Sequence, residues 1–554
     1  MVPMHVLSAA EMQACDRATT ERFGIPSLDL MRAASTAVAT FAQQQFPTAR
    51  RVTVLCGRGN NGGDGMMAAR LLAAAGLNIT TLLLGAPDAL KGDALAAWGE
   101  LLASAAPGTV QVIETADELA RHNDALQADL IVDAVLGTGF KPPLKGLALA
   151  ALEWLKAGAA PILAIDLPSG WPADETAAAP SGPVFPADAV ITFTAPKPAH
   201  LFGALTRQWS QPILVAPIGS PEAAIVSALQ LHWAGSALAF AQAPRLTAAN
   251  KGSFGHVLVV GGTMGTAGGK AGAPAMASLA ALRAGAGLVT AAVPAPALAV
   301  VSAIAPELMT WPLCATAAGS ISAESLAPDF LSALLAGKTV LAVGPGLGQS
   351  AETVKFVTGL LSATKILTVI DADALNILAA KPVLLAKLAK SHALVLTPHP
   401  GEMARLAGIT TTEVQANRLE VARGFARRLG VTLVLKGART LIAHPDGRVA
   451  VNTTGNPGMA KGGSGDVLTG LIAGLLAQYA GDPARAVEAA VALHGLAADL
   501  AVRATDEHTL LATDGLAHLS RAFRFRASGP NGYLWLQGLP AEALHTAAHR
   551  EAQE

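Results

Sequence analysis

The sequence predicts an α/β protein of at least two domains, in which mostly parallel sheets are covered by helices on both faces. Three observations lead to this prediction. Short, continuously apolar, β-branched segments alternate with alanine-rich helical segments along the whole chain. Each half also carries a glycine-rich loop with an aspartate, GNNGGDG at 59–65 and GNPGMAKGGSGDVLTG at 455–470. With 554 residues, the chain exceeds the size at which a single hydrophobic core keeps growing.

In the first half, five apolar segments bounded by glycine are expected to be strands. They are 51–57, 78–85, 128–137, 160–170 and 187–197. The segments 63–76 and 90–104 have apolar residues at helical spacing and are expected to be helices. A parallel sheet binds its ligand at the carboxyl ends of its strands. The loop at 57–65 and the DLPSG at 166–170 fall at such ends, so we expect a ligand site there.

The second half repeats this alternation without an obvious repeat of the first. Its expected strands are 255–262, 287–294, 338–348, 365–375, 392–402 and 431–452, and a helix is expected to follow Asp466. We expect the boundary between the domains to lie between 217 and 251. The expected domains are 1–235 and 236–525. The remaining tail, 526–554, has no periodic pattern and is expected to be loosely ordered.

Composition excludes several classes of protein. The net charge of -1 gives no electrostatic reason to expect nucleic acid or an anionic membrane as a partner. Three separated cysteines, Cys15, Cys56 and Cys314, form no CxxC pair, which excludes a disulfide framework and a zinc site and suits a reducing cytoplasm. The start of the chain does not have the pattern of a signal peptide. The uncharged stretches 223–244 and 284–306 are interrupted by polar residues, glycine or proline, and predict a buried strand plus helix. We therefore expect a soluble cytoplasmic protein.

The loop before Asp466 is suited to phosphate. GGSGD followed by a helix places backbone N–H groups and the positive end of a helix in one concave site. Asp466 is placed to accept a proton from a hydroxyl group that attacks such a phosphate. The alternative is an ordinary helix cap, because aspartate is a favoured capping residue.

Four motifs precede this loop in a characteristic order: GPGLG (344–348), IDADALN (370–376), TPHPGE (397–402) and VLKGART (434–440). Together with the segment 250–290 they resemble the ribokinase-like fold and, within it, the NAD(P)H-hydrate dehydratase family, over about 250–525. That family removes water from NADH or NADPH hydrated at the nicotinamide ring. It phosphorylates the ring hydroxyl with ADP and then expels phosphate.

This resemblance implies roles for individual residues. Asp466 would be the base, with the N–H groups of Gly463 and Gly465 stabilising the transferring phosphoryl group. The hydrated nucleotide would be bound by Ala273, Gly346, His399 and Asp466. ADP or AMP would be bound by Lys436, Gly437, Ala438, Arg439, Thr440 and Gly465. Mg²⁺ would be a cofactor, with Asp371 and Asp373 near it at most. For His399 the alternative is a loop histidine that only packs. The chain departs from the family at Lys461, where threonine is expected.

The earlier loop is neither a P-loop nor GxGxxG. It leaves a strand and opens a helix, which is compatible with a phosphate contact. Asn60, Asn61 and Asp64 add side-chain oxygens, which are hard ligands suited to alkali or alkaline-earth cations. The alternative is a plain strand–helix turn in which asparagine and glycine adopt left-handed backbone angles.

The companions of this loop are VLCGRGNNGGDGMMAARLL, IVDAVLGTGFKPPLKG, AIDLPSGW and FTAPKPAH. Over roughly 5–215 they resemble the NAD(P)H-hydrate epimerase family, which implies a Rossmann-like domain. The resemblance implies that Asn61, Asp133 and Ser169 coordinate K⁺. It implies that the dinucleotide is held by Asn60, Asn61, Gly62, Gly63, Asp64, Gly137, Thr138, Gly139, Phe140, Lys141, Pro142 and Pro143. Asp166 would contact the reacting ring as acid or base, the alternative being a turn cap. Ser35, in LMRAAS, departs from the expected alanine–glycine ending.

The two resemblances together imply a two-step repair enzyme. The first domain would interconvert the R and S hydrates, and the second would dehydrate the S form with ADP, releasing AMP and phosphate. NADHX, NADPHX and ADP are then the expected partners, without nucleic acid or membrane, in a homo-oligomer. One alternative is a ribokinase-like small-molecule kinase, for instance of a hydroxymethylpyrimidine, with a non-catalytic N-terminal binding domain. Another makes the first domain a scaffold for RNA-processing partners, although no basic run supports it.

Overall fold

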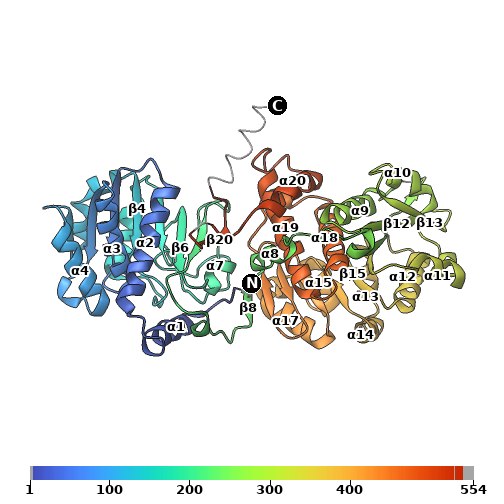
Figure 1. The fold of residues 1–554 in the computed structure, drawn as a ribbon, viewed down its shortest axis with the longest axis horizontal. Coiled ribbons are helices and arrows are strands. Elements are labelled where there is room, and N and C mark those ends of the chain that lie inside the picture. Colours follow the sequence, from blue (N-terminus) through green and yellow to red (C-terminus); the bar gives the residue numbers. More distant parts are fainter. Residues whose placement is uncertain (1–3, 267, 530, 541–554) are drawn as a thin grey trace. The chain divides into compact units, whose positions relative to one another are not determined.

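The computed structural model describes residues 4–266, 268–529 and 531–540. The chain divides into two compact units (Figure 1). The N-terminal unit comprises Met4–Gln230 together with the segment that begins at Ala527, and the C-terminal unit comprises Leu231–Arg526. Each unit is an α/β structure built on a mostly parallel sheet, which confirms the predicted fold class.

The sheet of the N-terminal unit has the strand order β20-β7-β6-β5-β4-β1-β2-β3. Its strands are β1 (Arg51–Cys56), β2 (Asn78–Leu84), β3 (Val110–Ile113), β4 (Leu130–Ala134), β5 (Ile162–Ile165), β6 (Ala189–Phe193), β7 (Ile213–Ala216) and β20 (Leu534–Gln537). Its helices are α1 (Ala9–Glu21), α2 (Ser27–Gln45), α3 (Asn60–Ala74), α4 (Gly92–Ser104), α5 (Ala116–Ala120), α6 (Gly146–Leu155) and α7 (Pro198–Phe202). Every pair of neighbouring strands is parallel except β20 and β7.

Helices cover both faces of this sheet. On one face, α2, α3 and α4 contribute Phe41, Leu72 and Leu101 to the core. On the other face, α5 and α6 contribute Leu119 and Leu152 to a second core cluster. The strands β4, β5 and β6 are buried along their whole length and are mostly apolar, as expected of central parallel strands, with Asp133 and Thr192 as the polar exceptions.

The segment after Phe525 was expected to be loosely ordered, and for residues 534–537 this prediction is wrong. They form β20, which pairs antiparallel with β7. Trp535 lies edge-to-face against Phe41, with the ring centroids 6.2 Å apart. A strand of four residues has no visible period, and its partners lie far earlier in the sequence. Residues 541–554 of the predicted tail lie outside the described part of the chain.

The sheet of the C-terminal unit has the strand order β13-β12-β9-β14-β15-β16-β17-β18-β19-β8. Its strands are β8 (Leu231–Trp233), β9 (His256–Val260), β12 (Leu288–Pro294), β13 (Met309–Leu313), β14 (Val340–Val343), β15 (Leu367–Ile370), β16 (Leu394–Leu396), β17 (Thr432–Leu435), β18 (Leu441–Ala443) and β19 (Val449–Val451), and β10 (Met264–Gly265) and β11 (Gly268–Gly269) form a separate hairpin. Its helices are α8 (Leu238–Ala241), α9 (Gly272–Ala284), α10 (Leu298–Ser302), α11 (Pro328–Leu335), α12 (Ala351–Ala363), α13 (Ala372–Ala379), α14 (Pro382–Ser391), α15 (Pro400–Ala407), α16 (Thr411–Ala416), α17 (Arg418–Leu429), α18 (Ser464–Gln478), α19 (Pro483–Ala501) and α20 (Ala512–Arg524).

The strands β9, β12, β14 and β15 form the parallel centre of this sheet. The helices α9 and α18 pack against each other and against β9. This packing places the amino end of α18, which carries the second glycine-rich loop, beside the amino end of α9. The predicted segment 431–452 is three antiparallel strands, β17, β18 and β19, rather than one.

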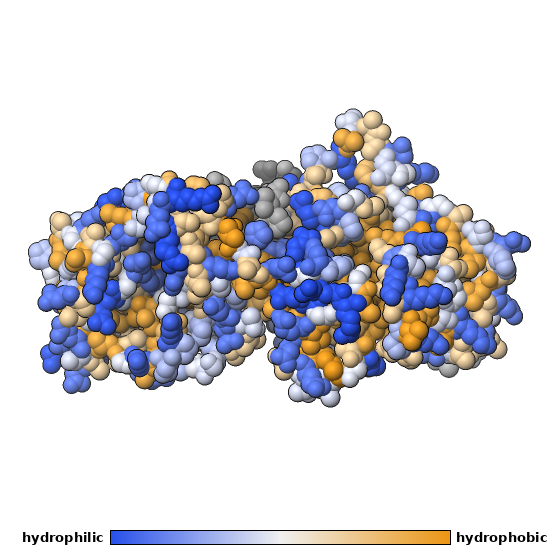
Figure 2. Space-filling view, turned by 90° about the horizontal axis from the view of Figure 1, so that it is seen from below, coloured by the Kyte–Doolittle hydropathy of each residue, from blue (hydrophilic) through white to orange (hydrophobic). Residues whose placement is uncertain are grey.

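In the described part of the chain, no helix is long and apolar enough to cross a membrane. The stretches 223–244 and 284–306 fold as predicted into a strand followed by a short helix, β8 with α8 and β12 with α10. Large exposed hydrophobic side chains such as Leu246 and Val383 come from separate elements. On the face drawn in Figure 2, hydrophobic residues lie among hydrophilic ones in both units.

Candidate active sites

A cavity of about 1150 Å³ lies at the carboxyl ends of the strands of the N-terminal unit. It is lined by loops that follow β1, β4, β5 and β6 and by side chains of α1 and α2. Among the residues predicted to hold the dinucleotide, those that line it are Asn60, Asn61, Asp64, Gly137, Thr138, Gly139, Phe140, Lys141, Pro143 and Asp166. The loop at 57–65 and the DLPSG segment at 166–170, which were both predicted to lie at a ligand site, therefore meet in one cavity.

Gly62, Gly63 and Pro142 are not among the residues that line this cavity. Gly62 is buried in the first turn of α3, where a Cβ atom would lie 1.8 Å from the carbonyl oxygen of Gly57. A Cβ on Gly63 would lie 2.7 Å from the side chain of Met31. The structure thus requires glycine at 62, because a side chain there would meet backbone atoms, whereas at 63 the end of the flexible Met31 side chain would have to move.

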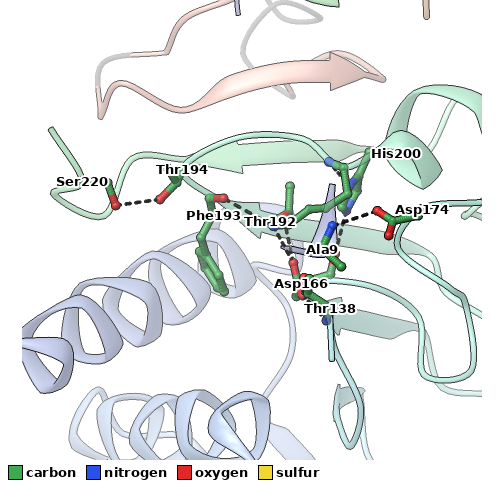
Figure 3. A network of polar contacts seen from close by, with 10 residues as sticks. Ala9, Thr138, Asp166, Asp174, Thr192, Phe193, Thr194, His200 and Ser220 are labelled. Atoms are coloured by element: carbon green, nitrogen blue, oxygen red, sulfur yellow. Dashed lines mark hydrogen bonds and ion pairs between the residues drawn. The ribbon is translucent and has the colours of Figure 1, made fainter. Parts of the chain in front are cut away.

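Asp166 lies at the centre of a network of polar contacts (Figure 3). Its Oδ1 accepts hydrogen bonds from Thr192 Oγ1 at 2.9 Å and from Lys197 Nζ at 2.9 Å. Its Oδ2 accepts from the backbone N–H of Thr138 at 2.6 Å and from the hydroxyl of the same residue. Both carboxylate oxygens therefore have two donors each. The alternative of a simple turn cap does not describe this arrangement.

Lys197 and His200 complete this network, although the sequence reasoning named neither as a site residue. Lys197 is 2% exposed, and its Nζ also donates to Thr192 Oγ1 at 2.8 Å. His200 Nδ1 accepts from the backbone N–H of Lys197 at 3.0 Å, so its Nε2 donates to the Asp166 carbonyl at 2.7 Å. The sequence feature that could have indicated Lys197 is its position in FTAPKPAH, four residues after the end of the buried strand β6.

The backbone and charge of Asp166 are both unusual. Its φ is 66°, a left-handed angle that costs free energy for a residue other than glycine and is found at functional sites. Burial raises the pKa of Asp166, but Lys197, His200 and Thr138 more than offset this, so that the pKa lies below its ordinary value. Asp166 is therefore an anion held in a fixed orientation. Burial lowers the pKa of His200 to about 4, so this ring is neutral.

Asn61, Asp133 and Ser169 come from the ends of the neighbouring strands β1, β4 and β5. The buried amide Oδ1 and Nδ2 atoms of Asn61 have no hydrogen-bond partner. Asp133 is fully buried and is hydrogen-bonded to Ser169 Oγ at 2.6 Å and to backbone N–H groups, with no cationic side chain among its partners. A buried carboxylate without a cationic partner and a buried amide oxygen without a hydrogen bond are both oxygen ligands that suit a monovalent cation, which would supply the missing charge.

Ser35, which departs from the family pattern, is fully buried in α2. Its Oγ donates to the carbonyl oxygens of Met31 at 2.7 Å and Asp64 at 3.1 Å. The hydroxyl group therefore ties α2 to the first turn of α3. Ser35 itself does not line the cavity, so the serine at this position adds a hydrogen bond between two helices without changing a lining residue.

A smaller cavity, of about 390 Å³, lies in the C-terminal unit between the loop before α9 and the starts of α13 and α18. Its lining residues are Lys270, Gly272, Ala273, Met276, Gly346, Ala372, Asp373, Asn376, Glu402 and Asp466. Three residues predicted to bind the hydrated nucleotide, Ala273, Gly346 and Asp466, are thereby brought together. The sequence reasoning did not name Lys270, Met276, Asn376 or Glu402.

Asp466 lies in the first turn of α18, whose cap is Gly463 with a φ of 95°. The structure gives no side-chain cap to this helix, so Asp466 is not the ordinary capping residue of the alternative interpretation. Burial and the nearby Asp371 raise the pKa of Asp466 to about 6, whereas Lys436 and Lys270 oppose the rise. A carboxylate with this pKa, free of hydrogen bonds in the described structure, is suited to act as a base near neutral pH.

Lys436 lies beside this aspartate. Its Nζ is 2.8 Å from Asp371 Oδ1 and 3.9 Å from Glu402 Oε2, and a Cβ on Gly465 would lie 3.4 Å from it. The second oxygen of Asp371 accepts from Thr469 Oγ1 at 2.7 Å. Asp371 is thus engaged with Lys436 and Thr469, and the ammonium group reaches the glycine loop where a phosphate would bind.

The remaining predicted residues of this unit lie around the cavity. His399 caps α15 through Nδ1, which accepts from Gly401 N–H at 3.0 Å, and its Nε2 lies 3.5 Å from Glu402 Oε1. Gly437 and Ala438 are exposed. Arg439 has a left-handed φ of 56°. Thr440 is also part of the predicted nucleotide segment, and its Oγ1 donates to Gly437 O at 2.9 Å. These four residues and His399 do not line the cavity.

Lys461, the second departure from the family pattern, is exposed, and its Nζ donates to the carbonyl oxygen of His508. It therefore fastens the glycine loop to the segment before α20. Among the described residues, no group of three or more His, Cys, Asp and Glu side chains could hold a metal ion. Asp373 accepts from Gly348 N–H at 2.8 Å and lines the cavity. Mg²⁺ commonly binds one or two carboxylates together with substrate phosphates, and Asp373 or Asp466 could provide such a carboxylate.

Comparisons with known proteins match both units. A family model described as NAD(P)H-hydrate dehydratase matches residues 257–521, and one described as YjeF-related protein N-terminus matches residues 27–199. A bifunctional NAD(P)H-hydrate repair enzyme Nnr from Moorella thermoacetica is 40% identical over 543 residues, covering 94% of this chain and 97% of its own. The protein of the same name from Escherichia coli is 36% identical over 536 residues, covering 94% of both chains. A solved structure, the ADP/ATP-dependent NAD(P)H-hydrate dehydratase from Bacillus subtilis co-crystallised with ATP and Mg²⁺, is 31% identical and covers 52% of this chain and 96% of its own, with a TM-score of 0.42.

Proposed function

The chain belongs to the family of bifunctional NAD(P)H-hydrate repair enzymes, and we propose from this that its two cavities act in turn on one damaged coenzyme. The N-terminal unit interconverts the R and S hydrates of NADH and NADPH. The C-terminal unit dehydrates the S form with ADP and releases AMP and phosphate. The alternative of a small-molecule kinase with a non-catalytic first domain leaves the polar network around Asp166 without a purpose.

For the dehydration, the carrying observation is the position of Asp466. Its carboxylate lines the cavity at the amino end of α18, beside the ammonium group of Lys436. Asp466 takes the proton of the ring hydroxyl as that oxygen attacks the β-phosphorus of ADP. AMP leaves, and loss of phosphate from the ring restores the reduced nicotinamide. Lys436 and the N–H groups of Gly463 and Gly465 stabilise the charge on the phosphoryl group.

The other predicted residues of this unit have binding roles in this proposal. Ala273, Gly346 and His399 hold the hydrated nucleotide. The segment that holds ADP comprises Lys436, Gly437, Ala438, Arg439 and Thr440, together with Gly465. Mg²⁺ would be held by the phosphates and the carboxylates beside them, where it would neutralise phosphate charge. The preference of this chain for ADP is part of the proposal.

For the epimerisation, Asp166 lies at the reacting ring. Inversion at the hydrated carbon requires either ring opening or loss and return of the hydroxyl group. Both routes need charged groups that are fixed in place and shielded from water, as Asp166 and Lys197 are. K⁺, held by Asn61, Asp133 and Ser169, would neutralise the buried carboxylate of Asp133 and order the loops around it. The loops that contain Asn60 and Gly137 then hold the dinucleotide.

The test uses the intact chain with a mixture of both NADHX epimers, ADP, Mg²⁺ and K⁺, and follows the absorbance of the reduced nicotinamide. We expect both epimers to be converted. Asp466→Ala should abolish conversion of both. Asp166→Ala should leave conversion of the S form at its wild-type rate and slow clearance of the R form. An equal loss for both epimers in Asp166→Ala would contradict the division of labour, and a stable phosphorylated product would favour the kinase alternative.

A further inference from the structure

Four aspartates line the cavity of the N-terminal unit in different surroundings, namely Asp16 of α1, Asp64 of α3, Asp93 of α4 and Asp166, and Glu114 also lines it. Asp166 has four hydrogen bonds and an ion pair, so neither of its oxygens is free to exchange a proton without losing a partner. Lys197 likewise directs its ammonium group at Asp166, Thr192 and the carbonyl oxygen of Phe193. The proton that moves during the reaction therefore has to be carried by another group in the cavity.

Asp16 is such a group. The helix α1 is fixed by Met12 and Cys15, which are buried in a cluster with Leu7, Ala195 and Ala224. Asp16 follows this buried face and lines the cavity half-buried, and the described structure gives its carboxyl group no hydrogen bond or ion pair. Burial raises the pKa of Asp16 above its ordinary value, with Lys197 opposing the rise and Asp166 adding to it. Because the pKa of Asp16 is raised and that of Asp166 is lowered, Asp16 carries a proton at pH values where Asp166 is already ionised.

We propose that Asp16 is a catalytic residue of the N-terminal cavity, which gives its proton to the ring hydroxyl as this leaves, while Asp166 remains an anion. This inference rests on the proposed epimerase function. The C–O bond breaks with its electron pair staying on oxygen, which leaves as water with the proton of Asp16. The lone pair of the ring nitrogen forms a C=N bond to the same carbon, so a cationic ring results. Water then adds to the other face and loses a proton, which restores the acid form of Asp16.

The division of roles follows from the surroundings of the two carboxyl groups. A fixed, ionised Asp166 stabilises the positive charge that develops on the ring, and needs no proton to do so. An unpaired, partly desolvated carboxyl group is the better donor near neutral pH. Two carboxyl groups whose surroundings drive their pKa values apart are the usual basis for such a pair of roles.

Asp64 is another carboxyl group of this cavity without a hydrogen bond or ion pair in the described structure, and it is less suited to this task. Burial raises the pKa of Asp64 well above its ordinary value, and the other charged groups that act on it, Asp166, Asp16 and Asp93, raise it further. No cationic side chain is among the groups that shift the pKa of Asp64, so nothing there favours the ionised form that must exist after a proton has been given up. Asp16 alone of the two has Lys197 among the groups that act on it.

The experiment measures conversion of purified R-NADHX into the S form by the full chain, in K⁺ buffer without ADP so that dehydration cannot occur. Asp16→Asn should lower the rate by about 100-fold or more, the usual contribution of a general acid. The matched control is Glu21→Gln, which removes an exposed carboxylate from the same helix and should leave the rate unchanged. Dehydration of the S form by each variant, after ADP and Mg²⁺ are added, reports on the integrity of the chain.

Two further readouts separate a catalytic from a structural role. The wild-type rate should fall as pH rises through the raised pKa of Asp16, and Asp16→Asn should lack this fall. The charged or titratable groups that face Asp16 are Lys197, Asp166 and Asp64. Added formate should restore part of the rate to Asp16→Ala, because a small acid can occupy the space of the missing carboxyl group. A wild-type rate in Asp16→Asn, or no rescue of Asp16→Ala, would overturn the inference. Failure of the wild-type chain to interconvert the epimers would instead overturn the proposed function.

Discussion

The Nζ atom of Lys197 lies 2.9 Å from Oδ1 of Asp166, and the lysine side chain is 2% exposed. Removing one partner of a buried ion pair is costly, because the other charge is left without compensation in a medium that solvates it poorly. The pair therefore fixes both the charge and the orientation of the carboxylate in the larger cavity. Lys197 does this as a positioning residue.

Lys197→Met should lower the free energy of unfolding of the N-terminal unit by about 3 kcal/mol at neutral pH. The pKa of Asp166 in the folded wild type lies below its unfolded value, so the stabilisation is present above about pH 4 and is lost as pH falls below it. The difference between wild type and variant, measured from urea unfolding between pH 7 and pH 3, should therefore shrink towards low pH. A difference independent of pH would show that lost packing of the lysine stem, and not its charge, is responsible.

Asp466→Asn should reduce dehydration of the S hydrate by at least about 1000-fold, because the variant lacks the carboxylate at the amino end of α18 that is proposed to take the proton of the attacking hydroxyl. In the wild type, kcat/KM for dehydration should rise with pH and level off above about pH 6, since the pKa of Asp466 is raised to about 6 and only its ionised form is a base. Lys436→Gln removes a cation that lowers the pKa of Asp466, so the midpoint of the pH profile of this variant should lie at higher pH than that of the wild type. Interconversion of the epimers is the control. A pH profile unchanged by Lys436→Gln would contradict the assignment.

The strands and the two loops could be predicted from the sequence because central parallel strands are buried on both faces and must be continuously apolar. The strands β3, β7 and β13 were missed. The strands β3 and β13 are short and partly exposed at sheet edges, and β7 is a buried strand of only four residues. The glycine-rich loops and the motif order pointed to Asp466 and Asp166, and most of the residues predicted to hold the dinucleotide line the larger cavity. Such site residues can be found from the sequence because they directly follow an apolar segment that is recognisable as a strand.

The partners of these residues could not be predicted in the same way. Lys197 reaches Asp166 only because β5 and β6 are neighbours in the sheet, and Asp16 faces the cavity only because α1 packs beside the strand ends. The hydrogen bonds that saturate Asp166 come from three separate loops or strands. The sequence also gave no sign that Gly62 and Gly63 serve helix packing, since a ligand loop and a close helix contact both require glycine.

Exchange of K⁺ for tetramethylammonium should slow interconversion of the epimers, because Asp133 would lose the only cation proposed to balance its charge. Asn61→Ala should raise the K⁺ concentration needed for half-maximal rate by about 10-fold or more, as loss of one oxygen ligand or its support does in other metal sites. The measurement is the initial rate of R-to-S conversion against K⁺ concentration at constant ionic strength. Dehydration of purified S hydrate should be unaffected in the same buffers. Equal rates in both salts would exclude a role for K⁺ in this unit.

Trp535→Ala should lower the free energy of unfolding of the N-terminal unit by about 2 kcal/mol, less than for a core tryptophan, because the indole is only partly buried against Phe41. Trp535→Phe keeps an aromatic contact and should cost less than half as much.

Removing the chain after Arg526 would take away β20 and leave the edge of β7 unpaired, so this variant should also aggregate on heating. The comparison is thermal inactivation of epimerisation against thermal inactivation of dehydration in the same samples. Because β20 belongs to the N-terminal unit, only the first should become more sensitive to heat; equal sensitisation of both would mean that the last strand supports the C-terminal unit as well.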